Sequence, residues 1–251
     1  MIARTGVSGW SFVPSSFALA GDVIHVWLVP MDNAHDSVPS CEKLLSSDER
    51  ERAGRFKFVR DRNRYIVAHA ALRWILAAYL RLNPLDFRFL LGPRGKPRLE
   101  SGRLTFNLTH SHEVALIAVT QSREVGVDVE WVSQDFAFDE VAERFFTPSE
   151  VAALAALPRQ LQRQAFYKCW TSKEAYLKAK GTGLSGELDE VEIVRGQDEV
   201  VRIEGGVPNW TLTELSSIEG YEAALVVEGH KAPLEYCLWE PQEAPSPHSR
   251  S

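Results

Sequence analysis

The sequence has few cysteines, no long apolar run and no excess of positive charge. Its three cysteines, Cys41, Cys169 and Cys237, are odd in number and widely spaced, which is typical of free thiols in a reducing cytoplasm rather than of a disulfide framework or a metal cluster. No apolar run approaches the roughly 20 residues that span a bilayer, and the first residues lack the basic start and long apolar core of a signal peptide. We therefore expect a cytoplasmic protein that does not act at a membrane.

The charge balance and the composition narrow the class of protein further. The 251 residues hold 28 Lys and Arg against 34 Asp and Glu, a formal net charge of −6, whereas a general nucleic-acid binder usually carries a basic excess. Hydrophobic residues make up 45% of the chain and charged residues 25%, which excludes a disordered, collagenous or coiled-coil protein. The length suits one large domain or two smaller ones, and either can bury a substantial core.

Positive charge is concentrated in one segment, residues 50–64, which reads RERAGRFKFVRDRNR. This basic segment holds seven cations and two anions, so the remainder of the chain carries a net −11. One interpretation is a solvated helix face. The other is a site for phosphates, because the planar guanidinium of arginine matches phosphate oxygens. The sequence alone leaves both open.

The order of predicted elements repeats along the chain. Ser46 with Glu49, and Thr147 with Glu150, have the pattern of a helix-capping box, and long helices are predicted further on, over 66–82 and 163–180. Runs of β-branched and aromatic residues predict strands, which cover 23–29, 87–91, 104–108, 114–120, 125–132, 191–194, 200–203, 210–215, 222–227 and 236–239. A shift of 101 residues superimposes the two capping boxes, although the residue identity is low enough for chance to be an alternative.

These elements predict an α+β fold made of two similar halves, residues 1–120 and 121–240. Each half would pack a long helix on a small, mainly antiparallel sheet. Residues 241–251 are rich in proline and serine and are predicted to form a disordered tail. Ligands favour junctions between such units, so we expect the active site between the halves.

Two carboxylates stand side by side in the predicted strand Gly126-Val127-Asp128-Val129-Glu130. Because side chains alternate between the faces of a strand, Asp128 and Glu130 project to one side. One interpretation is the exposed face of an edge strand. The other is a metal site, because two close carboxylates repel each other unless a cation lies between them. Oxygen ligands without a nearby histidine or cysteine favour Mg²⁺ over zinc.

A second candidate lies on the later long helix, where Trp170, Glu174 and Lys178 recur every four residues and share a face. Glu174 and Lys178 could form an exposed pair worth only about 0.3–0.5 kcal/mol. However, Trp170 is expected to be partly buried, and unpaired charge is costly near a core. This favours a functional site over an ordinary surface pair.

A third candidate is the stretch Asn107-Leu108-Thr109-His110-Ser111, in which we expect Thr109 and His110 to lie in a turn between two strands. A lone histidine in a turn is more often structural than catalytic. Small polar side chains and an imidazole at a strand end can nevertheless donate hydrogen bonds to phosphate oxygens. Each of the three stretches is weak alone, and their joint occurrence carries the weight.

Together these stretches resemble the 4′-phosphopantetheinyl transferases of the large, surfactin-synthetase-activating type. That family shows a Gly-Lys-Pro loop, an Asn-x-Ser-His-Ser turn, a Gly-Ile/Val-Asp-x-Glu strand and a Trp-x-x-Lys-Glu-Ala helix, in this order. The chain has, in the same order, Gly95-Lys96-Pro97, Asn107-Leu108-Thr109-His110-Ser111, Gly126-Val127-Asp128-Val129-Glu130 and Trp170-Thr171-Ser172-Lys173-Glu174-Ala175. The one departure, Thr109 in place of serine, keeps the hydroxyl. The resemblance spans roughly residues 45–185 and implies two α+β halves in one monomeric chain.

The resemblance also implies roles for individual residues at the phosphates. Asp128, Glu130 and Glu174 would hold Mg²⁺ against the pyrophosphate of coenzyme A, and Lys178 would contact that pyrophosphate. Thr109 and His110 would bind phosphate groups.

For the nucleotide end of coenzyme A, the resemblance implies other residues. The loop Gly95-Lys96-Pro97, together with Arg52 and Arg64, would grip the 3′-phosphoadenosine. The acidic substrates would bind at the basic segment together with Lys96, Lys173 and Lys178.

The reaction implied is the transfer of the 4′-phosphopantetheine arm from coenzyme A to a serine of an apo acyl- or peptidyl-carrier protein, with release of 3′,5′-ADP. Glu174 would take the serine proton, directly or through water, and Lys178 and His110 complete the catalytic set. One alternative is a relative that binds coenzyme A or a carrier protein without catalysis. A Mg²⁺-dependent nucleotide hydrolase is another, but it leaves the order of the motifs unexplained.

Overall fold

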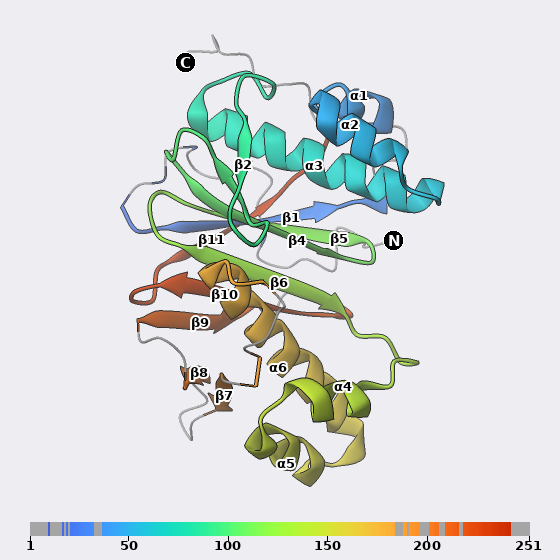
Figure 1. Ribbon diagram of the computed structural model, residues 1–251, viewed down its shortest axis with the longest axis vertical. Helices are drawn as coiled ribbons and strands as arrows, with labels where there is room; N and C mark the ends of the chain where they lie inside the picture. Colours follow the sequence, from blue (N-terminus) through green and yellow to red (C-terminus); the bar gives the residue numbers. More distant parts are fainter. Residues whose placement is uncertain are drawn as a thin grey trace.

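The computed structural model describes residues 10, 17, 19, 21–32, 37–183, 188–189, 191–195, 201–205, 209–215 and 218–241. Two sheets lie face to face between two long helices, which gives four layers (Figure 1). The predicted tail, 241–251, lies outside the described residues except for residue 241. None of the helices that the structure describes combines the length and the apolar character of a membrane span.

The first sheet has the strand order β11-β1-β5-β4 and is covered by α3 (Val59–Leu80). Its strands are β1 (Ile24–Pro30), β4 (Thr105–Ser111), β5 (Val114–Thr120) and β11 (Leu234–Leu238). In β1, Trp27 and Val29 pack beneath α3, whereas Val26 and Leu28 face the second sheet. Alternate residues of the strand therefore pack in two different cores, one on each face of the sheet, as the geometry of a strand requires.

The second sheet has the order β6-β10-β9 and carries α6 (Arg159–Lys180) on its outer face. Its strands are β6 (Val125–Trp131), β9 (Trp210–Glu214) and β10 (Tyr221–Glu228). Val127 and Val129 of β6 pack against the first sheet, while Leu177 of α6 packs on Ala224 and Val226 of β10. The α+β class predicted from the sequence, with a long helix on a small sheet in each half, is confirmed.

Smaller elements decorate both halves: α1 (Val38–Glu42), α2 (Ser47–Gly54), β2 (Phe89–Leu91), β3 (Pro97–Leu99), α4 (Phe138–Phe145), α5 (Pro148–Ala156), β7 (Glu192–Arg195) and β8 (Val201–Glu204). The division into residues 1–120 and 121–240 stays a prediction. One strand crosses it, because β11 comes from the second half and pairs in parallel with β1 of the first sheet.

The predicted boundaries differ most from the structure at three places. The helices α3 and α6 begin at Val59 and Arg159, earlier than predicted, because their first turns carry exposed or half-buried residues and show no clear apolar period. The predicted turn that contains Thr109 and His110 belongs to β4, which continues to Ser111. The strand is longer than its apolar pattern because its polar side chains bond to the neighbouring strand β6.

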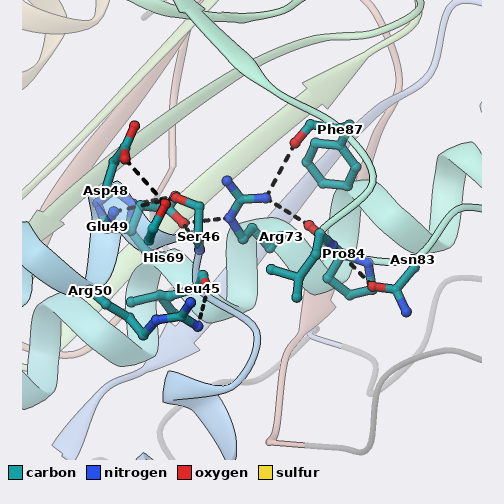
Figure 2. Close-up of polar contacts among 12 residues, drawn as sticks. Leu45, Ser46, Asp48, Glu49, Arg50, His69, Arg73, Asn83, Pro84 and Phe87 are labelled. Atoms are coloured by element: carbon teal, nitrogen blue, oxygen red, sulfur yellow. Dashed lines mark hydrogen bonds and ion pairs between the residues drawn. The ribbon is translucent and has the colours of Figure 1, made fainter.

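Each half contains the same polar contact between a short helix and the long helix. In this contact, which we call a clamp, a basic residue of the long helix binds the glutamate of the short helix's capping box. In the first half, Ser46 and Glu49 form the capping box of α2, and Arg73 of α3 donates to Glu49 Oε2 at 2.5 Å (Figure 2). Arg73 also donates to the carbonyl of Pro84 at 2.7 Å, in the chain that leaves α3. The second half repeats this with Glu150 of the α5 capping box and Lys173 of α6.

The clamps and helix ends refine the internal repeat. The residues that end α3 and α6, Arg81 and Gly181, both adopt a left-handed conformation and lie 100 positions apart. The capping boxes are 101 positions apart, so the predicted shift of 101 holds there but becomes 100 along the long helices.

The first clamp makes the free energy of unfolding depend on pH in the acidic range. Burial alone raises the pKa of Glu49, but the nearby His69 and hydrogen bonds from Arg73 and the Ser46 backbone outweigh it and hold the pKa at about 2, below the usual 4.5. A carboxylate with a lowered folded-state pKa stabilises the fold above its unfolded value, and this contribution is lost as pH falls from about 4.5 towards 2. The shift corresponds to roughly 3 kcal/mol.

We therefore expect Glu49→Gln to be less stable than the unmodified protein at pH 7 and to lose less stability on acidification. Urea unfolding at pH 7, 5, 4 and 3 measures the difference in unfolding free energy between the two proteins. A difference that stays constant over this range would contradict the assignment of the shift to Glu49.

Candidate active site

The acids of β6 face α6 because of the alternation along the strand. Val127 and Val129 point into the core between the sheets, so Asp128 and Glu130 point to the opposite side. Asp128 is 2% exposed and Glu130 is half-buried. β6 is an edge strand of its sheet, but the buried Asp128 excludes the solvent-exposed face that the sequence left open.

Gly126 allows α6 to lie directly on β6. A Cβ atom at this position would stand 2.1 Å from the carbonyl oxygen of Ala175 and 2.3 Å from the amide nitrogen of Ala179. Both of these are backbone atoms of α6, which cannot step aside as a side chain would. The glycine of the Gly-Val-Asp-Val-Glu strand therefore sets the distance between the strand that bears Asp128 and the helix that bears Glu174 and Lys178.

Hydrogen bonds connect β4, β6 and α6 at this contact. Lys178 Nζ donates to Asp128 Oδ1 at 2.6 Å and to Thr109 Oγ1 at 3.0 Å. Thr109 donates to the same Asp128 oxygen at 3.0 Å, and Ser111 donates to Glu130 Oε2 at 2.7 Å. The structure thus brings Thr109, Asp128 and Lys178 into direct contact.

Glu174 of α6 is buried one helical turn before Lys178 and so lies on the same helix face. Burial, followed by the charge of Asp128, raises the pKa of Glu174 to about 7, with Lys178 acting in the opposite direction. Burial and Asp128 likewise raise the pKa of Glu130, and burial raises that of Asp128 against the effect of Lys178. Three crowded carboxylates with one nearby ammonium leave negative charge uncompensated.

The cluster can hold a divalent cation. As they stand, no three His, Cys, Asp or Glu side chains of the described residues form a metal centre. However, Asp128 Oδ2 and Glu174 Oε1 are buried, and no described residue donates a hydrogen bond to them. Buried carboxylate oxygens without donors are the ligands that Mg²⁺ prefers, so the residues present fit this ion.

His110 lies apart from Thr109, although the two are adjacent in the chain. Successive side chains of β4 leave the strand on opposite faces, and Thr109 is buried whereas His110 is exposed. Partial loss of hydration lowers the pKa of His110, and His69 of α3 and Lys178 lower it further. The candidate site therefore extends from α6 towards α3.

Two lysines that the sequence placed among the anion-binding groups have partners within the protein. Lys96 Nζ donates to Glu124 Oε2 at 2.8 Å and to the carbonyls of Val125 and Ala179, both at 3.1 Å, so its loop is attached to β6 and to the end of α6. Gly95 precedes it with a φ of +87°, and Pro97 begins β3. Lys173 is fully buried and bonded to Glu150, so it is not part of an anion-binding surface.

Most arginines of the basic segment form ion pairs. Arg64 makes two hydrogen bonds of 2.6 Å to the carboxylate of Asp32, and Arg62 donates to Glu42 at 2.9 Å. Arg52 differs, because no carboxylate of the described residues pairs with it, and its guanidinium lies 5.6 Å from the ring centre of Tyr65. Tyr65 in turn contacts His69, with ring centres 4.0 Å apart, and the charge of His69 acts on His110.

Three residues of the site lie within the candidate stretches, but the sequence reasoning assigned them no individual role. Asn107 accepts a hydrogen bond from the backbone of Val127 at 2.8 Å, Ser111 binds Glu130, and Gly126 admits the helix. The signal for the first two was present, because Asn107, Thr109 and Ser111 alternate at i, i+2 and i+4 and so share a face of one strand.

Comparison with known proteins identifies the family. Residues 124–226 match the model of the 4′-phosphopantetheinyl transferase superfamily. The 4′-phosphopantetheinyl transferase HetI of Nostoc sp. is 38% identical over 225 residues, which cover 88% of this chain and 94% of HetI. The 4′-phosphopantetheinyl transferase Sfp of Bacillus subtilis is 31% identical over 162 residues, which cover 64% of this chain and 71% of Sfp. A holo-(acyl-carrier-protein) synthase of Bacillus anthracis, solved with CoA (3′,5′-ADP), matches 43% of this chain and 96% of its own at 22% identity and a TM-score of 0.39.

The similarity to HetI extends over nearly the whole of both proteins. The chain therefore belongs to the 4′-phosphopantetheinyl transferase superfamily, and it is a phosphopantetheinyl transferase.

Proposed function

We propose that this protein moves the 4′-phosphopantetheine arm of coenzyme A onto a serine of an apo acyl- or peptidyl-carrier protein, using Mg²⁺ held by Asp128, Glu130 and Glu174. The observation that best supports this proposal is a pair of buried carboxylate oxygens, Asp128 Oδ2 and Glu174 Oε1, to which no described residue donates a hydrogen bond. They lie beside the ammonium of Lys178. A cluster of carboxylates that also contains the ammonium of Lys178 suits a reaction centre on a pyrophosphate. Both sheets and both long helices lie in one chain, so we propose that it acts as a monomer. Its free cysteines, Cys41, Cys169 and Cys237, suit the reducing cytoplasm, where we propose that it acts.

The bound Mg²⁺ would neutralise charge that develops on the pyrophosphate oxygens. The other groups that take part are the carrier's serine and side chains of this chain. The serine oxygen attacks the β-phosphorus, the bond from that phosphorus to the bridging oxygen breaks, and 3′,5′-ADP leaves. Because the nucleophile belongs to the carrier protein, this chain needs no nucleophile of its own.

Glu174 is the base that takes the serine proton, directly or through water. Without a bound metal ion, burial and the charge of Asp128 raise the pKa of Glu174 to about 7, so its carboxylate holds a proton more strongly than an ordinary glutamate does. Lys178 stabilises charge on the pyrophosphate and delivers a proton to the departing 3′,5′-ADP. Thr109 holds Lys178 in place, with a hydrogen bond of 3.0 Å.

The nucleotide of coenzyme A would lie towards α3. His110 and Thr109 bind phosphate groups, and Arg52 contacts the 3′-phosphoadenosine beside the loop Gly95-Lys96-Pro97, which Lys96 attaches to Glu124, Val125 and Ala179. Arg52 is favoured over Arg64, because Arg64 is already committed to Asp32 through two hydrogen bonds.

Incubation of the protein with coenzyme A, Mg²⁺ and an apo carrier protein tests this function. Intact-mass spectrometry of the carrier is expected to show the addition of one phosphopantetheine, with 3′,5′-ADP as the second product. An unchanged carrier with bound coenzyme A would indicate a binding protein, and release of phosphate would indicate a hydrolase; either result contradicts the proposal.

The role of Arg52 gives a separate prediction. A hydrogen bond to a charged group contributes about 1.5–3 kcal/mol, so Arg52→Ala is expected to raise the KM for coenzyme A by about tenfold or more and to leave kcat nearly unchanged. If Arg52 contacts the 3′-phosphate, the same substitution has little effect on the KM for 3′-dephospho-coenzyme A. Arg55→Ala is the matched control, because the exposed Arg55 pairs with Glu51 of its own helix. Equal effects of Arg52→Ala on both substrates would contradict the contact.

A further inference from the structure

A buried ion pair lies directly next to the proposed base. Lys173 precedes Glu174 in α6 and is 1% exposed. Its ammonium donates to Glu150 Oε2 at 2.7 Å, to the carbonyl of Leu188 at 2.5 Å and to the carbonyl of Val191. All three donors of the ammonium are thus used within the protein, and the catalytic scheme above has no role for it.

Glu150 extends this ion pair to further elements. One oxygen, Oε2, also accepts the backbone N–H of Thr147 at 2.8 Å, which closes the capping box of α5. The other, Oε1, accepts the backbone N–H of Ile193 at 2.7 Å. The pair Lys173–Glu150 therefore attaches α6 to the start of α5, to the chain that follows α6 and to β7.

Lys173 and Glu174 contact different parts of the molecule. Successive helical residues are about 100° apart around the axis, so the lysine reaches α5 and β7 while the glutamate shares a helix face with Lys178, which bonds Asp128 of β6. Gly126 fixes how closely α6 approaches β6. It leaves open how far the helix is rotated about its own axis, and the anchored ammonium of Lys173 fixes that rotation.

We infer that the Lys173–Glu150 pair positions the carboxylate of Glu174 by fixing the rotation of α6. The inference rests on the proposed function, in which Glu174 takes the serine proton. Lys173 and Glu150 are positioning residues and touch no reacting atom.

The first half supplies an internal comparison. Arg73 of α3 binds Glu49 of the α2 capping box and the carbonyl of Pro84, in the same arrangement (Figure 2). The residue that follows Arg73 is Trp74, a core residue with no acid–base chemistry. The same kind of clamp thus occurs once beside a proposed catalytic group and once without one.

Removal of both charges of each clamp tests the inference. The variants are Glu150→Gln/Lys173→Met and the matched control Glu49→Gln/Arg73→Met, because removing one partner alone would leave a buried charge unpaired. We expect both to lower the melting temperature. Misplacement of a catalytic group by about 1 Å can cost about 10²-fold. We therefore expect the first variant to reduce kcat by about 10- to 100-fold and to raise the Mg²⁺ concentration needed for half-maximal rate.

The KM for coenzyme A should change by less than about twofold in that variant, because the nucleotide site lies elsewhere. The control should keep kcat at saturating substrate within about twofold. A clamp variant of the second half that melts lower but keeps its kcat and its Mg²⁺ dependence would overturn the inference.

Glu150→Asp covers the case in which the double variant does not fold, since it keeps the charge and shortens the side chain by one methylene. A reduced kcat with an unchanged KM supports positioning, whereas an unchanged kcat with a lowered melting temperature shows a purely structural pair. Glu174→Gln run in parallel separates the two proposals. If Glu174→Gln is inactive and the clamp variants are fully active, only the positioning role is wrong; if Glu174→Gln is active, the proposed function of Glu174 is wrong.

Discussion

Replacement of Glu174 with glutamine is expected to lower the kcat of phosphopantetheine transfer by about 10²–10⁴-fold, the usual contribution of a general base. The substitution keeps the shape of the side chain but removes both its basicity and one proposed metal ligand. The fold should survive, because Glu174 stands among like charges whose repulsion the neutral amide relieves. Asp128→Asn should be at least as damaging, since Asp128 is also the partner of Lys178.

Glu214→Gln is the matched control for this prediction. Glu214 of β9 and Asp128 of β6 are both in register with Ala224 of β10, so the two acids lie in one row across the α6-facing side of the sheet. Glu214 pairs with Lys168, outside the proposed site. Initial rates at saturating coenzyme A and carrier protein, with thermal melting of each variant, provide the measurement. Near-normal kcat in both Glu174→Gln and Asp128→Asn would remove the basis for the proposed chemistry.

Gly126→Ala is expected to be severe although it adds a single methyl group. The new Cβ would meet backbone atoms of α6 at 2.1 and 2.3 Å, so either the helix or the strand has to move. Overpacking of this kind typically costs about 1–3 kcal/mol, occasionally more. Because the displaced helix carries Glu174 and Lys178, we expect kcat to fall at least about tenfold even in the fraction that stays folded.

Gly54→Ala separates this effect from a general loss of glycine. A Cβ at Gly54 meets no atom within 4 Å, and the residue ends α2 without a positive φ, so the substitution should be neutral or stabilising by less than about 1 kcal/mol. Urea unfolding and kcat are measured for both variants. Gly126→Ala with the unfolding free energy and kcat of the unmodified protein would show that the close approach of helix and strand is unimportant.

The sequence predicted the local features that depend on local physics. The capping boxes at Ser46 and Thr147 are present, Gly181 ends α6 in the left-handed conformation, and the alternation of valine with acid in β6 placed Asp128 and Glu130 on one face. These signals depend on neighbours within about four residues, which the sequence displays directly.

The direction of individual side chains was harder to predict, because it depends on partners far along the chain. Lys96 looked like an anion-binding residue, but it donates to oxygens of Glu124, Val125 and Ala179. Lys173 lies next to a site residue and still faces away from the site, because its partner Glu150 comes from another helix. Thr109 and His110 were expected together in a turn and are separated by the pleat of β4.

The central claim, that Asp128, Glu130 and Glu174 form one magnesium site beside the pyrophosphate, is tested most directly by metal binding. Mg²⁺ is titrated calorimetrically into the protein saturated with coenzyme A, and into the variant Asp128→Asn/Glu130→Gln/Glu174→Gln under the same conditions. We expect one ion per chain in the unmodified protein and at least a tenfold weaker affinity in the variant, while coenzyme A still binds both. Unchanged Mg²⁺ affinity in the triple variant would contradict the account.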